Sequence, residues 1–145
     1  MKKTSVILFA AALAGVTVFE GCKKYEEGPG LSFRSREERV ANTWEVEKVL
    51  EGGVEVANPD GTVTFDKDGG FSATYTSFGV SITLNGTWQL VNDDEDIEVK
   101  VTSNGISSTT TAKILKLKEK ELWVKDLGDT NDPADDVETH YKPAN

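Results

Sequence analysis

Residues 80–90 alternate between apolar and polar side chains, and this pattern constrains the fold more than any other feature of the sequence. A β-strand points successive side chains to opposite faces, so the pattern predicts one long strand with a buried face and a solvated face. Gly86, within the run, predicts a bend or a bulge. The positions on the expected buried face are Val80, Ile82, Leu84, Gly86, Trp88 and Leu90.

Shorter stretches with the same period, separated by turn residues, continue from residue 43 to the end of the chain. Asp60-Gly61, Asp68-Gly69 and Asn104-Gly105 predict hairpin turns, because glycine and asparagine tolerate the positive φ that tight turns require. The alternation slips at Ile114 and Leu115, which predicts a bulge in the sixth strand. The strands expected are residues 43–50, 61–66, 70–77, 80–91, 95–103, 106–117, 120–126 and 136–142.

Eight strands in simple succession, without a helix long enough for a crossover, predict an all-β fold. We expect an eight-stranded antiparallel up-and-down barrel, since closure removes exposed strand edges. A two-sheet sandwich would show the same period and is the alternative.

A short helical turn is expected to precede the barrel. Ser35 and Glu38 have the spacing of a capping box, which predicts a turn of helix over residues 35–41. All arginines of the chain lie within this turn or directly before it: Arg34, Arg36 and Arg39. We expect them to pair locally with the acidic domain, and a clamp on the carboxylates of a partner is the alternative.

The only cysteine of the chain, Cys22, follows an apolar run that is too short to span a membrane. The run covers residues 6–19, whereas a spanning helix needs about 20 residues. With Lys2 and Lys3 before the run and Gly21 directly before Cys22, the segment resembles the lipobox of bacterial lipoproteins. The resemblance implies a signal peptide over residues 1–21 and lipidation of Cys22. A secretory signal cleaved elsewhere, leaving a free thiol, is the alternative.

The mature chain then divides into a polar tether, residues 22–34, and one domain, residues 35–145. The acidic pair Glu26-Glu27 resembles the export signals of surface lipoproteins of Gram-negative bacteria. We therefore expect anchoring in the outer membrane at the cell surface, with the periplasmic face of the same membrane as the alternative. The net charge of −9 argues against nucleic acid as a partner and leaves membrane contact to the acyl chains on Cys22.

Several short motifs within the mature chain resemble one known family. Asn42-Thr43-Trp44 opens the first strand, an Asp-Gly turn lies between aromatic residues over residues 65–71, and Gly86-Thr87-Trp88 follows. Together with the lipobox, the tether and the arginine-rich turn, these motifs resemble the lipocalin-like domains of small bacterial outer-membrane lipoproteins. The resemblance implies a barrel that encloses a small apolar ligand, such as a fatty acid or an isoprenoid, and it implies no reaction.

The candidate ligand-binding residues are the large side chains expected to face inward. Ser108, Thr110 and Ala112 are expected to leave room beside them, while Phe78 and Trp123 fall out of phase and would mark a partner surface if exposed. A barrel filled by its own side chains, acting as an interaction module for another envelope protein, is the alternative. The candidates are Trp44, Phe65, Phe71, Tyr75, Leu84 and Trp88.

No constellation of catalytic residues stands out, and we expect neither an enzyme nor a cofactor. The single histidine, His140, is expected at the surface of the last strand, where one imidazole does not make a zinc site. An acidic loop near Pro133 has oxygen ligands of the kind calcium takes, but its spacing favours a solvated loop without metal. Its acidic and amide residues are Asp129, Asn131, Asp132, Asp135 and Asp136.

Overall fold

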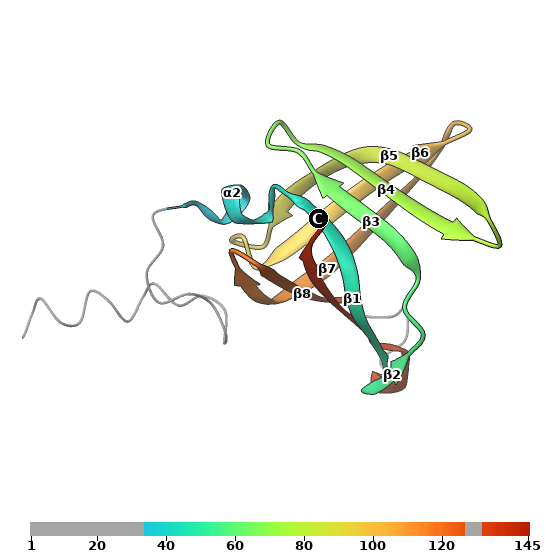
Figure 1. Cartoon of the computed structure of the whole chain (residues 1–145). Helices are drawn as coiled ribbons and strands as arrows, with labels where there is room; N and C mark the ends of the chain where they lie inside the picture. Colours follow the sequence, from blue (N-terminus) through green and yellow to red (C-terminus); the bar gives the residue numbers. More distant parts are fainter. Residues whose placement is uncertain (1–33, 127–131) are drawn as a thin grey trace, which may run out of the picture.

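The computed structural model describes residues 34–126 and 132–145, in which one antiparallel sheet closes into a barrel (Figure 1). Each barrel strand pairs with the next along the chain, and the last pairs back to the first. This closure confirms the eight-stranded up-and-down barrel and excludes the sandwich. The barrel strands are β1 (Thr43–Glu51), β3 (Asp60–Phe65), β4 (Gly70–Ser77), β5 (Val80–Val91), β6 (Asp96–Ser103), β7 (Ile106–Lys118), β8 (Glu121–Asp126) and β9 (Val137–Pro143).

A short additional strand, β2 (Val54–Val56), shows that the turn predicted at Asp60-Gly61 is wrong. The chain turns instead at Gly52 and Gly53, whose φ values are 55° and 82°. Gly61 lies within β3 opposite Tyr75, and a Cβ there would overlap the Tyr75 ring and the carbonyl oxygen of residue 74. Position 61 therefore needs glycine for close approach rather than for a turn.

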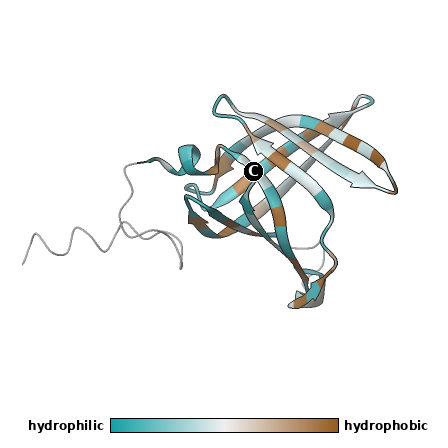
Figure 2. Ribbon diagram, viewed as in Figure 1, coloured by the Kyte–Doolittle hydropathy of each residue, from teal (hydrophilic) through white to brown (hydrophobic). Residues whose placement is uncertain are grey.

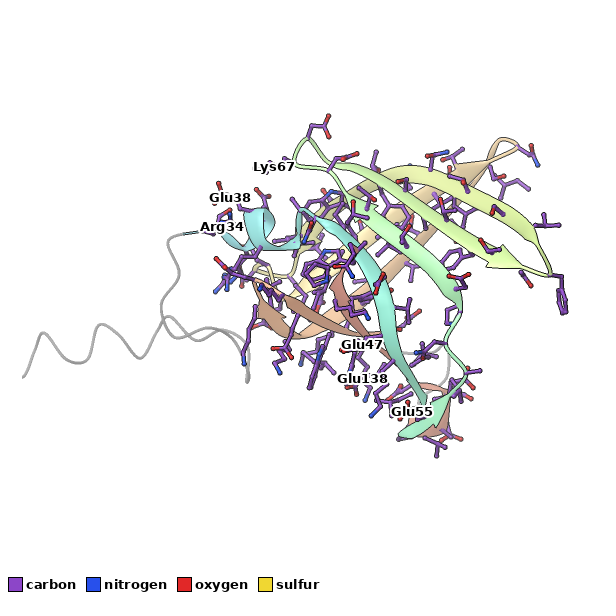
Figure 3. All side chains as sticks on the ribbon, viewed as in Figure 1. Arg34, Glu38, Glu47, Glu55, Lys67 and Glu138 are labelled. Carbon is purple, nitrogen blue, oxygen red and sulfur yellow. The ribbon has the colours of Figure 1, made fainter. Side chains whose placement is uncertain are left out.

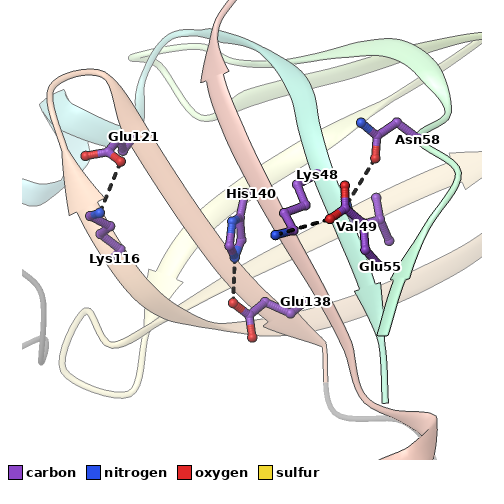
Figure 4. A network of polar contacts seen from close by, with 8 residues as sticks. All are labelled: Lys48, Val49, Glu55, Asn58, Lys116, Glu121, Glu138 and His140. Carbon is purple, nitrogen blue, oxygen red and sulfur yellow. Dashed lines mark hydrogen bonds and ion pairs between the residues drawn. The ribbon is translucent and has the colours of Figure 1, made fainter. Parts of the chain in front are cut away.

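The gap between β2 and β3 along β1 is bridged by the side chain of Asn58. Its amide oxygen accepts from the backbone N–H of Val49 at 3.1 Å (Figure 4). Its amide nitrogen donates to the carbonyl of Glu47 at 2.6 Å. The side chain thus bonds β1 backbone groups where the pairing with β2 begins.

The predicted helical turn is α2 (Arg36–Val40), which lies at one end of the barrel, here called the base (Figure 1). The capping box is confirmed, because Ser35 Oγ accepts from the Glu38 N–H at 3.1 Å and Glu38 Oε2 accepts from the Ser35 N–H at 2.9 Å. Arg36 pairs with Asp94 at 3.5 Å, and Arg39 donates to the carbonyl of residue 117 at 3.4 Å. These arginines hold α2 against the β5–β6 and β7–β8 turns.

The densest part of the core lies directly inside the base. Trp44 is fully buried, and its Nε1 donates to the Val40 carbonyl at 2.8 Å, so a strand residue and α2 close the base together. The buried core consists of Val40, Trp44, Val63, Phe65, Ala73, Trp88, Ile97, Ile114, Leu117 and Leu122. Because these residues and all the strand pairings lie within residues 40–143, we infer that residues 34–145 fold on their own.

Two irregular positions were expected from the sequence. The bulge in β7 is confirmed by a register shift between Ile114 and Lys116. The pairing of β4 with β5 runs through Gly86 without a shift, so Gly86 is no bulge. A Cβ at Gly86 would overlap the carbonyl oxygen of Lys100 and lie 2.9 Å from its carbonyl carbon, which shows that β6 approaches β5 closely there. No helix in the described part of the chain is both long and apolar enough to cross a membrane.

Replacing Gly86 by alanine should destabilise the barrel by about 1–3 kcal/mol, because the new methyl group meets backbone that has to shift. Urea unfolding of residues 34–145 measures the loss. Thr87→Ala, at the exposed neighbouring position, is the matched control and should change stability by less than about 0.5 kcal/mol. Equal stability of the two variants would contradict the close approach.

Candidate functional site

A cavity of about 320 Å³ occupies the barrel interior above the core, toward the end opposite α2, here called the mouth. Its floor is core, since Val63, Phe65 and Leu122 belong to both. It reaches solvent at Thr110, which is exposed. The lining residues come from seven of the eight barrel strands, and most of them are apolar.

Four of the six candidate ligand residues line this cavity: Phe65, Phe71, Tyr75 and Leu84. Phe65 lies 5.4 Å from Phe71 between ring centroids, so the two rings form a continuous aromatic wall. These residues lie on β3, β4 and β5, where the alternation points them inward.

Trp44 and Trp88, the other two candidates, lie below the cavity and do not line it. The Trp88 ring packs edge-on against Phe65 at 5.4 Å, and its Nε1 donates to the Asp66 carbonyl in the β3–β4 turn at 2.8 Å. Buried indole N–H groups usually find an acceptor. The backbone carbonyls at the base supply one for each tryptophan, which places both rings there.

The opposite wall was not among the candidates. It comes from β6, β8 and β9, and includes Val99, Val124, Thr139 and Tyr141. The alternation of Val137, Thr139 and Tyr141 in the last strand carries the signal that would have identified them. Thr110 and Ala112 line the cavity and leave the expected room on β7, whereas Ser108 does not take part.

Tyr141 is the more enclosed of the two phenols that line the cavity. Burial raises the pKa of the Tyr141 phenol far above its usual value, and the nearby Tyr75 raises it further, while a hydrogen bond with Thr139 offsets part of the rise. Burial also raises the pKa of Tyr75. Both phenols therefore stay protonated at neutral pH and present hydrogen-bond donors. Among the described lining residues, none is basic, and Asp126 is the single carboxylate.

The outer face of β7, β8 and β9 carries a cluster around Trp123 that the sequence did not predict. Figure 4 draws three of its members, Lys116, Glu138 and His140. His140 is only 8% exposed and stacks on Trp123 with ring centroids 3.9 Å apart. The prediction that His140 lies at the surface is therefore wrong. Its Nε2 lies 2.6 Å from Glu138, and Lys116 Nζ lies 4.0 Å from the centre of the Trp123 ring. Trp123 is thus packed rather than exposed, and this cluster lies outside the cavity.

The acidic loop lies partly outside the described residues, which exclude Asp129 and Asn131. Asp132 caps the short 3₁₀ helix η2 (Pro133–Asp135) by accepting from the N–H of Ala134 at 3.0 Å. Asp136 pairs with Lys125 at 2.8 Å. Within residues 34–126 and 132–145, no three His, Cys, Asp or Glu side chains are grouped in a way that suits a metal ion.

The raised pKa values predict that stability falls at alkaline pH. Unfolded tyrosine ionises near pH 10 while the folded Tyr141 keeps its proton, so its contribution is present below pH 10 and is lost as the pH rises further. The free energy of unfolding of residues 34–145, measured with urea, should fall by about 1 kcal/mol per pH unit above pH 10. Tyr141→Phe should remove most of that slope, and Tyr75→Phe a smaller part. An identical slope in Tyr141→Phe would contradict the assignment.

No protein-family model matches the sequence, and no curated protein matches it. Solved structures do. A lipocalin-like protein from Bacteroides uniformis, solved at 1.79 Å, is 16% identical, with a TM-score of 0.58 over 73% of this chain and 99% of that one.

A second crystal structure, of an uncharacterized protein from Bacteroides eggerthii, is 15% identical, with a TM-score of 0.56 over 72% of this chain and 99% of its own. At these identities the likeness concerns the fold. Together with the closed barrel, it shows that this chain has a lipocalin-like fold.

Proposed function

We propose that this protein binds one small, uncharged, mostly apolar molecule in the barrel while acyl chains on Cys22 hold it to a membrane. The observation that carries the proposal is the cavity of about 320 Å³ above a fully packed base. Ligand pockets occupy about 300–1,000 Å³, so this one suits a small ligand. At ~30 Å³ for each water molecule, it has room for on the order of ten waters.

The lining favours an uncharged ligand. A carboxylate or phosphate inside a low-dielectric cavity needs a cationic partner, and the described lining has none. Of the two ligand types suggested by the sequence, a fatty acid is therefore disfavoured against a neutral molecule. Tyr141 and Tyr75 would donate to a single hydroxyl or carbonyl oxygen on an otherwise apolar ligand.

The proposed role is binding without catalysis. His140 lies on the outer face and engages Glu138 and Trp123, so it does not reach a molecule held in the cavity. The described lining offers hydroxyls and one carboxylate, Asp126, but no histidine, cysteine or lysine.

The support for attachment through Cys22 comes from the sequence alone, because the structure does not describe this residue. The chain enters the barrel at the base, through α2. The mouth therefore lies at the end away from the proposed anchor. We place the protein in the outer membrane, with the cell surface favoured by the acidic Glu26-Glu27 pair.

The binding test uses the neutral dye N-phenyl-1-naphthylamine with residues 34–145. We expect saturable fluorescence enhancement, reversed by dodecanol and at least about tenfold less readily by dodecanoate. Ala112→Phe should weaken dye binding at least about tenfold, because Ala112 lines the cavity and the added ring fills it.

Thr111→Phe adds the same ring at the neighbouring outward position of β7, and should leave the dye affinity within about twofold. Urea unfolding establishes that both variants fold. Dye binding that is absent in the wild type, or equal in the two variants, would rule out the barrel interior as the site.

Lipidation is tested in a Gram-negative host with a clickable fatty acid. The wild-type chain should take up the label and fractionate with membranes, whereas Cys22→Ala should do neither, because its thiol is the only one in the chain. Cys22→Ala together with Ser35→Cys, which returns one thiol beyond the tether, should remain unlabelled. Label retained in Cys22→Ala would reject the lipoprotein assignment.

A further inference from the structure

Two hairpins project beyond the closed part of the barrel at the mouth (Figure 1). β5 pairs with β6 from Gly86 onward, whereas residues 80–85 pair with β4 alone. Among the described strands, residues 106–111 of β7 likewise pair with β6 alone. The β4–β5 hairpin, in which β4 still pairs with β3 as far as Thr76, and the β6–β7 hairpin therefore part from each other beyond the barrel wall and flank the cavity as two ribbons.

These ribbons carry most of the exposed large apolar side chains in the described residues. Val80 and Ile82 are 62% and 56% exposed and lie on the same face of β5 as Leu84, which lines the cavity. Figure 2 shows hydrophobic colouring toward the far ends of these hairpins. Ile106 is 75% exposed and lies on the same face of β7 as Thr110 and Ala112. Phe78 is completely exposed in the β4–β5 turn. We call Phe78, Val80, Ile82 and Ile106 the mouth rim.

Phe78 is unusual in conformation as well as in exposure. Its φ is +50° and that of Gly79 is +77°, a pair of values for which Asn-Gly is the preferred sequence. A bulky residue at positive φ is disfavoured. Neither local conformation nor packing in the isolated barrel accounts for a phenylalanine at this position, which points to a contact outside the barrel.

The ribbons are also free of charge, although 28% of the residues in the chain are charged. No charged residue occurs in residues 69–92 or in residues 101–112. The β1–β2 hairpin at the same end carries Glu51 and Glu55. In Figure 3 the labelled charged side chains lie at the base or on the β1 and β9 side, away from the ribbons: Arg34, Glu38, Lys67, Glu47, Glu55 and Glu138.

We propose that the mouth rim docks on the surface of a zwitterionic lipid bilayer, from which the apolar ligand enters the cavity. This inference rests on the proposed function. Apolar side chains gain free energy in the bilayer interface, while each charged group would oppose insertion. The uncharged ribbons meet both conditions, and their serine and threonine hydroxyls suit the hydrated headgroup region, where the backbone at the strand edges also stays solvated.

The charge pattern favours a bilayer over a protein partner. A specific protein interface buries about 800 Å² on each side and uses polar or charged pairs at its rim to fix its register. The two ribbons offer no charges for such pairs. A fluid bilayer needs none. The net charge of −9 gives no attraction to anionic headgroups, so the preferred surface is zwitterionic.

The proposed anchor is long enough to allow this contact on its own membrane. The tether, residues 22–34, reaches at most roughly 45 Å when extended. The 12-residue strand β5 is about 40 Å long at ~3.3 Å per residue. A barrel on such a tether can tip until its mouth meets the bilayer in which the acyl chains are held.

The test is flotation of residues 34–145 with phosphatidylcholine vesicles. The wild type should float with these vesicles, and phosphatidylglycerol should not increase the bound fraction. Phe78→Asn should lower the partition coefficient about tenfold. This variant keeps the turn, because Asn-Gly suits the two positive φ values, and its urea midpoint should not fall.

Val54→Asn is the matched control, since it removes another exposed apolar side chain, 67% exposed, from the charged β1–β2 hairpin. It should leave the partition unchanged. Because residues 34–145 contain no cysteine, single cysteines also report orientation. A bimane dye on Ser81→Cys should be quenched by spin-labelled lipid, and the same dye on Lys67→Cys at the base should not.

Transfer of dodecanol from vesicles to the barrel separates this inference from the proposed function. Phe78→Asn should slow the transfer about tenfold but bind dodecanol supplied from cyclodextrin with wild-type affinity. Vesicle binding without any dodecanol uptake would reject the proposed function and leave the docking surface. Dodecanol uptake with no flotation, with flotation only on anionic vesicles, or with an equal loss in Val54→Asn would overturn the docking proposal. So would a stable dimer that Phe78→Asn abolishes, which would make the rim a protein contact.

Discussion

The hydrogen bond from the Trp44 indole to the Val40 carbonyl is the contact on which the rest of the barrel depends. It joins the first strand to α2 in a fully buried setting, where an unpaired N–H would cost about 1–3 kcal/mol. Trp44 also lies where β1 meets both β3 and β9, so the same residue sits at the closure of the sheet. The base is therefore sealed, and any open interior has to lie toward the mouth.

The distribution of side-chain size and charge along the barrel follows from this seal. Both tryptophans of the core lie near the base, where backbone carbonyls accept from their N–H groups. Nearer the mouth, smaller residues such as Ala73, Thr110 and Ala112 leave the cavity open. Ion pairs lie on the outer face and beside the β8–β9 loop, including Lys142 with Glu45 and Lys125 with Asp136. A mostly apolar cavity thus opens between two ribbons that carry no charged residue, which is the path that we propose for an apolar molecule.

Features set by neighbouring residues in the chain were predictable. The alternation of residues 80–90 identified the inward face of β5, but Val80 and Ile82, which were expected to be buried, are 62% and 56% exposed. Asp68-Gly69 and Asn104-Gly105 marked real turns, and Ser35 with Glu38 formed the capping box. Gly61 was misread because its requirement comes from Tyr75 on another strand. His140 was misread for the same reason, since its burial comes from stacking on Trp123 in β8.

Local patterns in the sequence specify an all-β chain with one inward face per strand, because alternation and turn chemistry act over a few residues. They also specify where charge is absent. Which inward residues fill the barrel and which surround its cavity depends on packing between distant strands. Trp44 and Tyr75 both point into the barrel, but Trp44 lies at the sealed base and Tyr75 lines the cavity. That difference depends on height along the barrel and on hydrogen-bond acceptors from distant turns, which periodicity in the sequence does not encode.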